Sequence, residues 1–428
     1  MARILLSAYA CEPDRGSEPG VGWSWVSELS RLGHRLWVLT RADNRAAIEG
    51  RAPSGVKFIY YDLPRPMLRV RTFPGGKRLY YVLWQWFAVQ HIRKHFSQLP
   101  FDMVQHVTYV SARYPSFMGL LGVPFYFGPV SGGESVPVKL REGFPRRERW
   151  REWLRDLSNR LVPFDPLLRL VFRQATRIIV TPATVALVPP RWREKCSVQL
   201  AVGLSKEYLR QARAVSRHTG PGPGHSWRLL YVGRLLECKG VDIALRAVWQ
   251  LKQWLDVRFT IVGDGPARAQ LEKLVEGLGL TEVVEWVGWL PHHEVEDHYR
   301  AAELFLFLSL RDSGGVAVLE ALAHGLPVVC TELGGPGVIV NEHCGRVLQA
   351  RDKNTEELAT DCAHALREIL TTPGLWDRLS AGAKSRAQDF DSQNLVASIY
   401  PVSSFPAAAD QHEHSLPLSA LVARDAAL

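Results

Sequence analysis

The sequence predicts an α/β protein with two domains of similar size that hold a ligand between them. Through most of the 428 residues, apolar runs of strand length alternate with helix-periodic segments, which is typical of parallel sheets. The alternation is interrupted at residues 218–226, where Pro-Gly-Pro-Gly and the loss of periodicity indicate a linker. In open parallel sheets a ligand lies outside the carboxyl ends of the strands, so the loops there are expected to carry the chemistry.

The first domain is predicted over residues 1–205. Short apolar runs predict its strands, at residues 3–8, 36–40, 103–108, 124–127 and 177–181. The first strand is followed by a loop with several glycines, Gly20 among them. A helix comes next, and its apolar face includes Trp25 and Leu29. Gly33 follows the last turn of that face and marks the end of the helix.

The second domain is predicted over residues 228–387, after a linker at 206–227. Its strands are expected at residues 229–232, 258–262, 283–287, 304–309 and 326–331. Helix-periodic segments lie between them, at residues 241–255, 266–278, 294–302 and 316–324. Residues 388–404 are expected to form a helix that returns to the first domain. The tail, residues 405–428, is rich in alanine and serine and is expected to be disordered.

The composition excludes several classes of protein. Hydrophobic residues make up 46% of the chain and charged residues 22%, which is ordinary for a globular protein and unlike a collagenous, coiled-coil or disordered one. No apolar run reaches the roughly 18 residues of a membrane-spanning helix, and the amino-terminal sequence lacks signal-peptide features, so a cytoplasmic protein is expected. The six cysteines form no Cys-x-x-Cys motif and are expected to be reduced and mostly structural.

The first strand of the second domain leads into a loop with two basic residues. Arg234 and Lys239 stand five positions apart, between the strand end and the next helix. An arginine fork and a lysine ammonium at that place can clamp a diphosphate, and the helix amino terminus adds positive potential. The alternative is a pair of solvated surface charges.

Two further loops of this domain carry candidate ligand contacts. The turn 263–266, Gly-Asp-Gly-Pro, lets a ligand approach the backbone at Gly265, although such turns also occur without ligands. A later loop has Asp312 and Ser313 before two glycines, and the helix after it carries Glu320. Backbone N–H groups at that helix start can bind phosphate or sugar oxygens, and the carboxylates can accept hydrogen bonds from hydroxyl groups. The alternative makes Asp312 a helix cap and leaves Glu320 exposed.

The order and spacing of these motifs resemble those of GT-B fold glycosyltransferases of family 4. The first domain supplies Gly-His-Arg-Leu-Trp-Val at residues 33–38, after its glycine-rich loop. The second supplies Val-Gly-Arg with Lys-Gly at 232–240, Val-Gly-x-Gly-Pro at 262–266, and Glu-Ala-x-Ala-x-Gly-x-Pro-Val-Val at 320–329. The resemblance extends over about residues 2–400 and implies two Rossmann-like domains that face each other across a cleft.

The resemblance implies a retaining transfer of a sugar from a nucleotide-sugar, bound mainly by the second domain, to an acceptor bound mainly by the first. Arg234 and Lys239 are then expected to neutralise the donor diphosphate and stabilise the departing nucleotide. Glu320 is expected to hold the ribose hydroxyls. Further donor contacts are expected from Gly20, Gly265, Ser313, Gly314, Gly315 and Val316. The pathway implied is polysaccharide, lipopolysaccharide or glycolipid biosynthesis.

Three positions depart from the family pattern, one of them being residues 201–203, Ala-Val-Gly, in place of the usual Asn-Gly after the first domain. Asp312 stands where the first glutamate of a paired motif is usual; although one methylene shorter, it can still bind sugar hydroxyls and is a candidate catalytic residue. Gln105-His106-Val107 replaces the His-x-His that the family often shows at the end of a strand. His106 is the candidate active-site histidine, against the alternative of a core histidine. Because Asp312 replaces glutamate, a non-catalytic relative of the family is another alternative.

No metal ion or other cofactor is expected, and the nucleotide-sugar counts as a co-substrate. Arg234 and Lys239 already supply positive charge at the expected diphosphate site, so Mg²⁺ is not needed there. The Asp-x-Asp sequence at 389–391 is far in sequence from that site, and the three histidines within 292–298 lack tetrahedral ligand spacing.

The net charge of +9 is divided unevenly along the chain. Residues 1–214 carry +17 and the remaining residues −8. Within the basic part, residues 69–94 and 139–160 interleave basic and aromatic residues, which suits an anionic membrane surface, where each nearby cation contributes about 1 kcal/mol. The alternative is a core-facing helix with a solvated back. The resulting hypothesis is a protein peripheral to the inner face of a membrane that acts on a saccharide or lipid-linked acceptor.

Two other classes of protein fit the sequence less well. A nicotinamide-dependent oxidoreductase would show Gly-x-Gly-x-x-Gly directly after the first strand, where a long loop without that motif follows instead. A nucleic-acid-binding protein would explain the basic part through phosphate contacts, but not the donor-type loops of the acidic part. No nucleic-acid partner is therefore expected.

Overall fold

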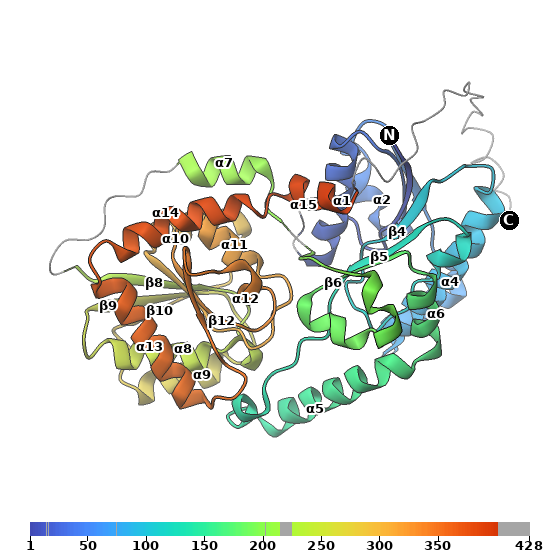
Figure 1. Ribbon diagram of the computed structural model, residues 1–428. Coiled ribbons are helices and arrows are strands. Elements are labelled where there is room, and N and C mark those ends of the chain that lie inside the picture. Colours follow the sequence, from blue (N-terminus) through green and yellow to red (C-terminus); the bar gives the residue numbers. More distant parts are fainter. Residues whose placement is uncertain (14, 16, 74, 202, 215–224, 401–428) are drawn as a thin grey trace.

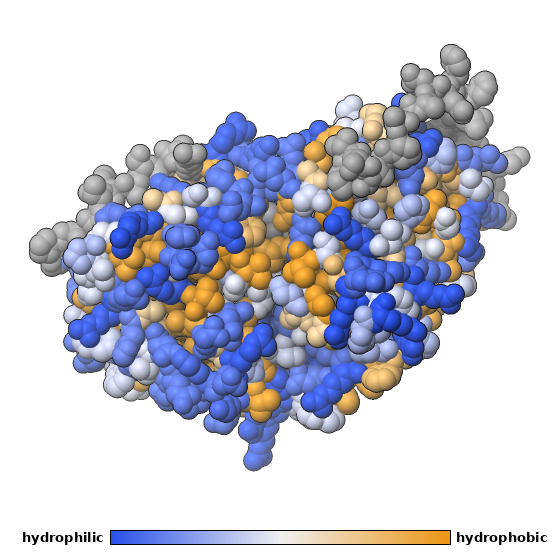
Figure 2. All heavy atoms as spheres, in the orientation of Figure 1, coloured by the Kyte–Doolittle hydropathy of each residue, from blue (hydrophilic) through white to orange (hydrophobic). Residues whose placement is uncertain are grey.

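The protein folds into two α/β domains, each built on one parallel sheet, and this confirms the predicted fold class (Figure 1). The computed structural model describes residues 1–13, 15, 17–73, 75–201, 203–214 and 225–400. The domains lie side by side, and α5 (Arg146–Leu161) runs along the lower edge of the amino-terminal domain toward the carboxyl-terminal domain (Figure 1). In the same view, hydrophilic residues cover most of the rim of the molecule and hydrophobic residues gather nearer its centre (Figure 2).

The amino-terminal domain has a seven-stranded sheet in the order β3-β2-β1-β4-β5-β6-β7. Its strands are β1 (Arg3–Ser7), β2 (Arg35–Thr40), β3 (Val56–Tyr60), β4 (Met103–His106), β5 (Phe125–Val130), β6 (Arg177–Val180) and β7 (Cys196–Val198). Its α-helices are α1 (Ser17–Arg31), α2 (Arg45–Ile48), α3 (Arg65–Leu68), α4 (Gly76–His95), α5 (Arg146–Leu161) and α6 (Pro166–Gln174). The two strands without a sequence prediction, β3 and β7, are the two edges of the sheet. Their residues are half-exposed or exposed with a single exception, so they lack the apolar run of a buried strand.

The carboxyl-terminal domain has a six-stranded sheet in the order β10-β9-β8-β11-β12-β13. Its strands are β8 (Trp227–Val232), β9 (Val257–Val262), β10 (Val284–Gly288), β11 (Leu304–Phe307), β12 (Val328–Thr331) and β13 (Gly345–Leu348). Its α-helices are α8 (Val241–Leu251), α9 (Arg268–Gly277), α10 (His292–Ala301), α11 (Val316–Ala323), α12 (Pro336–Ile339), α13 (Thr355–Thr371) and α14 (Leu375–Gln388). The helices and strands predicted for this domain are all present, with ends shifted by a few residues.

The segment predicted as a linker is partly helical. Helix α7 (Lys206–Ala214) packs against α11 and α14, and Leu209 and Ala212 are buried there. The prediction of a linker from residue 206 is therefore wrong, because the apolar face of this short helix belongs to the core of the second domain. Residues 215–224, the centre of the predicted linker, and the tail predicted to be disordered, 405–428, lie outside the described residues.

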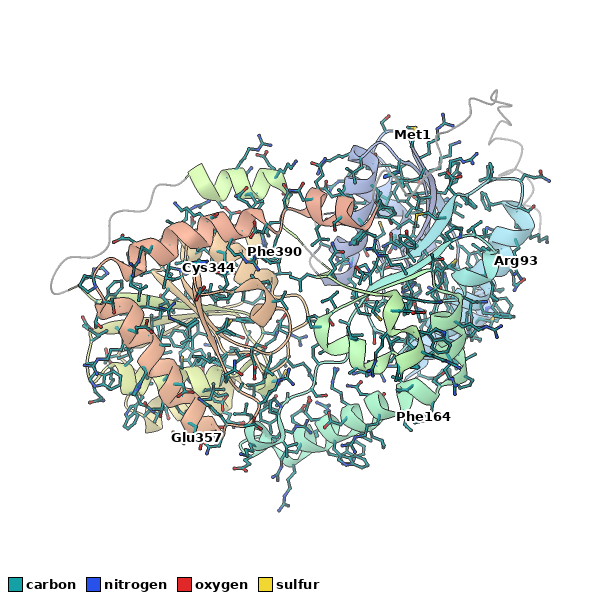
Figure 3. All side chains as sticks on the ribbon, in the orientation of Figure 1. Met1, Arg93, Phe164, Cys344, Glu357 and Phe390 are labelled. Carbon is teal, nitrogen blue, oxygen red and sulfur yellow. The ribbon has the colours of Figure 1, made fainter. Side chains whose placement is uncertain are left out.

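The chain crosses back to the first domain near its end. Helix α15 (Ser392–Ile399) packs against α1 (Figure 1). The Ser392 hydroxyl is 3.0 Å from Glu28 Oε1, and the Gln199 side-chain amide donates to the Leu395 carbonyl at 2.6 Å. Phe390 lies at the crossing (Figure 3). This second connection limits how far the two domains can separate.

Candidate active site

The candidate site lies where the strand order of the second sheet reverses. β8 and β11 are neighbours, and the chain proceeds to one edge through β9 and β10 and to the other through β12 and β13. Ligands of such sheets bind outside the carboxyl ends of the strands at this switch point. The loops that carry Lys239 and Asp312 follow these two strand ends.

Lys239 and Asp312 form an ion pair at the switch point, and each side chain is only 18% exposed. The Lys239 ammonium also lies 5.5 Å from the centre of the Phe307 ring. The other carboxylate oxygen of Asp312, Oδ1, accepts hydrogen bonds from the N–H groups of Gly314 (3.1 Å) and Gly315 (2.7 Å). Asp312 thus orders its own loop and joins it to the loop after β8. The alternative that Asp312 caps the helix is wrong, because Gly315 is the cap position of α11 and the helix has no side-chain cap.

These hydrogen bonds correct one expectation about the donor contacts. The N–H groups of Gly314 and Gly315 are not free for a donor, because Asp312 accepts from both. Gly315 is required for a different reason: its φ is 64°, and a Cβ would lie 2.6 Å from the Ile339 side chain. Helix α11 begins next, at Val316, and has no side-chain cap. Its first-turn N–H groups remain for an anionic oxygen.

Glu320 is buried in the second turn of α11, with 7% of its surface exposed, so the alternative of an exposed helix residue is wrong. Its Oε1 lies 2.8 Å from Nε2 of His292, and its Oε2 accepts from the Tyr299 hydroxyl at 3.0 Å. Both partners come from α10. The hydrogen bond with Glu320 raises the pKa of His292, against the opposing effect of burial.

The turn after β9 packs on the loop after β8. The Leu235 N–H donates to the Asp264 carbonyl at 3.0 Å, and the Ala267 N–H donates to the Leu235 carbonyl at 3.1 Å. A Cβ on Gly265 would lie 2.3 Å from the Leu235 carbonyl oxygen. The neighbouring loop therefore requires this glycine, and its contact with a donor stays a prediction.

Arg234 lies where it was expected, and Gly20 does not. Arg234 is exposed directly after β8, as a diphosphate contact would require. Gly20 lies in the first turn of α1 rather than in a loop, because the helix already begins at Ser17. A Cβ on Gly20 would lie 1.9 Å from the Arg15 carbonyl oxygen, so packing against the preceding segment requires glycine. The expected contact between Gly20 and the diphosphate stays a prediction.

His106 is a core residue in this structure. It ends β4, a central strand, and has no exposed surface. Its ring stacks on Phe127 with 5.4 Å between centres, and its Nε2 lies 3.5 Å from the Tyr81 hydroxyl. Burial lowers the pKa of His106 to about 3. The structure therefore corrects the prediction of an active-site histidine in favour of the core alternative, since a fully enclosed ring has no surface for a substrate.

Helix α5 supplies the opposite side of the site. Arg311, which directly precedes Asp312, forms an ion pair with Glu152 of α5, and these side chains are 22% and 6% exposed. The Lys139 ammonium donates to the Asp352 carbonyl at 2.8 Å. Both contacts join the two domains, and the Arg311–Glu152 pair does so next to Asp312. Neither Arg311 nor Glu152 was predicted as a site residue, because their contact depends on how the two domains pack and leaves no local pattern in the sequence.

Comparison with known proteins identifies the second domain. Residues 217–386 match the family model for glycosyl transferases group 1. The carboxyl-terminal domain is thus similar to the glycosyl transferases group 1 family, and it is called the group 1 domain below. WcaL of Salmonella typhimurium, a glycosyltransferase assigned to colanic acid biosynthesis, is 37% identical over 189 residues, which cover 40% of this chain and 44% of WcaL. The chain thus matches less than half the length of this relative.

Solved structures extend the similarity to the whole fold. Sucrose-phosphate synthase from Thermosynechococcus elongatus has a TM-score of 0.60 and 17% identity, with 94% of this chain and 98% of that chain covered. HepE from Anabaena, in complex with UDP, has a TM-score of 0.57 and 17% identity, with 94% and 100% covered. The chain has the GT-B fold. Its group 1 domain carries the Lys239–Asp312 pair and Glu320.

The described residues contain no group of three or more His, Cys, Asp or Glu side chains that could hold a metal ion. The two aspartates of the Asp-x-Asp sequence have other partners. Asp391 accepts from two N–H groups at the start of α15, and Asp389 pairs with Arg386 at 2.8 Å. Of the three histidines, His292 contacts Glu320 of the group 1 domain, which the sequence analysis did not predict.

The contact between His292 and Glu320 predicts a pH dependence of nucleotide binding. Because the folded-state pKa of His292 is raised, the pair stabilises the fold below the unfolded value of about 6.5, and this contribution is lost as pH rises through the folded-state pKa. Protonated His292 also competes with ribose hydroxyls for Glu320. The affinity for a nucleoside diphosphate, measured by calorimetry, should therefore rise between about pH 6 and 8.

Two histidine variants isolate this effect from the titration of the nucleotide itself. The pH dependence of the affinity has one part from the titration of the nucleotide and one part from His292. His292→Asn should remove the second part and leave the first. His293→Asn changes the adjacent residue, which is 80% exposed, and should keep the wild-type profile. If wild type and His292→Asn give superimposable curves, His292 does not compete for Glu320.

Proposed function

We propose that the protein is a retaining glycosyltransferase of family 4 that transfers a sugar from a nucleotide-sugar to an acceptor held by the amino-terminal domain. The observation that carries this proposal is the Lys239–Asp312 ion pair at the switch point of the group 1 domain, with the buried Glu320 on the helix that follows the Asp312 loop. A nucleotide-sugar presents a diphosphate and ribose and sugar hydroxyls, which are the groups that these side chains can bind. The relative WcaL and the lipopolysaccharide glycosyltransferase WaaG support a role in surface polysaccharide or lipopolysaccharide biosynthesis.

The proposed mechanism uses charge that is already in place. Lys239 and Arg234 neutralise the diphosphate as the glycosidic bond breaks and negative charge grows on the leaving nucleotide. The first-turn N–H groups of α11 add positive potential on the same side. Glu320 accepts hydrogen bonds from the ribose hydroxyls. Asp312 keeps the Lys239 ammonium in place and can turn toward the sugar when the diphosphate takes over its role as counter-ion.

A thermal-shift screen of nucleoside diphosphates tests the proposal directly. A ligand that binds the native state at 100 times its Kd stabilises it by about 2.7 kcal/mol, which raises Tm by several degrees in a protein of this size. At least one nucleoside diphosphate should do so in the wild type. If no nucleoside diphosphate shifts Tm, the proposed donor-binding role is wrong. If the free base or ribose produces the same shift, the protein does not bind the diphosphate and the proposed roles of Arg234 and Lys239 are wrong.

We also propose that the protein binds peripherally to the inner face of a membrane. None of the described helices is both long and apolar enough to cross a bilayer. Helix α5 exposes Trp150 (60%) and Trp153 (55%) among its arginines, and Phe164 just beyond the helix is 72% exposed, on the outer side of the domain (Figure 3). Exposed aromatic side chains and cations on one helix fit an anionic bilayer surface.

Vesicle binding tests this surface. The change of Trp150 and Trp153 to serine should weaken binding to vesicles with 30% anionic lipid by about tenfold, because two aromatic side chains no longer enter the interface. Trp289→Ser is the control, since Trp289 is 75% exposed on the other domain. The assignment fails if this control loses as much affinity, or if wild type binds neutral and anionic vesicles equally in a flotation assay.

A further inference from the structure

Three arginines from three separate segments gather where α5 faces the group 1 domain. Glu152, Arg155 and Asn159 share one face of α5, because they are spaced by three and four residues. Arg311 of the group 1 domain pairs with Glu152, and Arg113 of the loop region after β4 donates to Asn159 Oδ1 at 2.8 Å. Arg155 thus lies between the other two arginines along the helix.

Two of the three guanidinium groups have partners within the protein. Arg311 contacts Glu152 and also lies 3.5 Å from the Cys238 sulfur. Arg113 binds Asn159 and the Gly132 carbonyl. The side chains of Arg311 and Arg113 are therefore held in place by other groups of the protein.

Arg155 differs from these two. Within the described part of the chain, its guanidinium has no hydrogen bond or ion pair, although it is half-buried. Burial, and then the charges of Arg311 and Arg113, lower the pKa of Arg155 to about 10. The group stays charged at neutral pH. A half-buried cation beside two others is unfavourable unless an anion joins them.

The nearest acidic side chains do not supply that anion. Glu152 is the partner of Arg311. Glu134 is buried, and its two oxygens accept from the Gly132 N–H (2.8 Å) and the Thr181 hydroxyl (2.6 Å). Both carboxylates lie close enough to raise the pKa of Arg155, but three arginines face two carboxylates, so the cluster keeps an excess of positive charge.

An apolar groove adjoins this cluster. Its volume is about 500 Å³, and α5 and the start of α6 form its walls. Leu154, Leu157, Leu161 and Phe164 line it, and the polar residues of the lining are Arg113, Ser158 and Asp165. The Asp165 carboxylate already accepts from two N–H groups at the start of α6. These leucines and Phe164 are themselves 36 to 72% exposed, so the groove opens to the outside. Arg113 is the member of the cluster that lines the groove, and the apolar walls of the groove would accept a hydrocarbon chain.

We propose that Arg155, together with Arg113 and Arg311, binds an oxyanion of the acceptor, a phosphate or a carboxylate, while the groove holds the apolar chain attached to it. This inference rests on the proposed function and narrows its acceptor to anionic amphiphiles. Arg311 directly precedes Asp312, so the bound oxyanion lies next to the loop that holds the donor. The acceptor would then enter from the side on which Trp150 and Trp153 are exposed.

Calorimetry on the full chain tests the proposal with octyl phosphate as the probe. Octyl phosphate should bind more tightly than octanol, which lacks the charge, and more tightly than inorganic phosphate, which lacks the chain. Arg155→Gln should weaken octyl phosphate binding by about tenfold or more, since hydrogen bonds to a charged group are lost. Octanoate, compared at the same ionic strength, distinguishes a carboxylate site from a phosphate site.

Arg149→Gln is the matched control, because Arg149 is an exposed arginine of the same helix. It removes the same charge and should change octyl phosphate binding by less than about twofold, the scale of an exposed charge. Leu157→Asn should lower the affinity to that of inorganic phosphate. Equal losses in Arg155→Gln and Arg149→Gln, or equal affinities for octanol and octyl phosphate, would overturn the site. Because Arg155 has no partner within the described residues, Arg155→Gln should keep the wild-type Tm, and Arg155→Lys offers a second variant with the charge retained.

The nucleoside diphosphate screen separates this proposal from the one on which it rests. If octyl phosphate binding depends on Arg155 but no nucleoside diphosphate shifts Tm, the oxyanion site stands and glycosyl transfer does not. If a nucleoside diphosphate binds while octyl phosphate does not, the donor site stands and the acceptor is not an anionic amphiphile.

Discussion

Replacement of Lys239 by alanine should lower kcat by about 10²- to 10³-fold, the usual effect of removing a fixed group that stabilises charge in the transition state. The Lys239 ammonium is the cation at the switch point, it is mostly enclosed, and it is held by Asp312. Negative charge grows on the leaving diphosphate, so the loss should fall on kcat more than on KM. Steady-state kinetics with a donor identified by the thermal-shift screen measure both constants.

A second variant separates lost catalysis from a damaged fold. Lys239→Ala leaves the Asp312 carboxylate without its counter-ion, which should lower Tm. Adding Asp312→Asn removes that charge, while the amide oxygen can still accept from the N–H groups of Gly314 and Gly315. The double variant should regain stability but not turnover. Lys273→Ala, at an exposed position of α9, should behave as wild type. Near wild-type turnover in Lys239→Ala would remove this residue from the catalytic site.

Glu320→Gln should raise the Kd for the nucleoside diphosphate by about 10- to 100-fold, because a charged acceptor of one or two ribose hydrogen bonds becomes neutral. The substitution keeps the size of the side chain, and its amide oxygen can still accept from the Tyr299 hydroxyl. The fold should therefore persist, with a Tm close to that of wild type. Titration calorimetry gives the affinity.

The ribose itself provides the sharpest check on Glu320. The corresponding 2′,3′-dideoxynucleotide lacks the ribose hydroxyls and should bind the wild type weakly. Its affinity for Glu320→Gln should be the same as its affinity for the wild type. Glu294→Gln, at an exposed position of the neighbouring helix α10, should leave both affinities unchanged. If the glutamine variant loses equal affinity for both nucleotides, Glu320 supports the fold of the site rather than the ribose.

The sheets were predictable wherever a strand is buried on both faces. Strand β11, Leu-Phe-Leu-Phe, is buried at every residue, and its continuous apolar run stands out in the sequence. The edge strands β3 and β7 have few buried residues and gave no such signal. Helix α7 was missed because its apolar face is short and lies beside a segment with the composition of a linker.

The donor side of the site was also largely predictable. Lys239, Asp312 and Glu320 were selected because they follow strands of one parallel sheet, and parallel strands bring such loops to the same edge. The hydrogen-bond partners and the burial of these side chains were not predictable. The pairing of Asp312 with two glycine N–H groups and the burial of Glu320 against α10 depend on contacts between distant segments.

The sequence by itself determined the two α/β domains, the unequal division of charge and the loops of the candidate donor site. Each of these features depends on the periodicity or composition of a local segment. Only the tertiary structure decided that His106 is enclosed in the first core, that His292 meets Glu320, and that three arginines gather beside α5. Such contacts join residues that are far apart in the chain and, in the last case, in different domains. Their formation depends on how sheets and helices pack, and no spacing within a single segment encodes it.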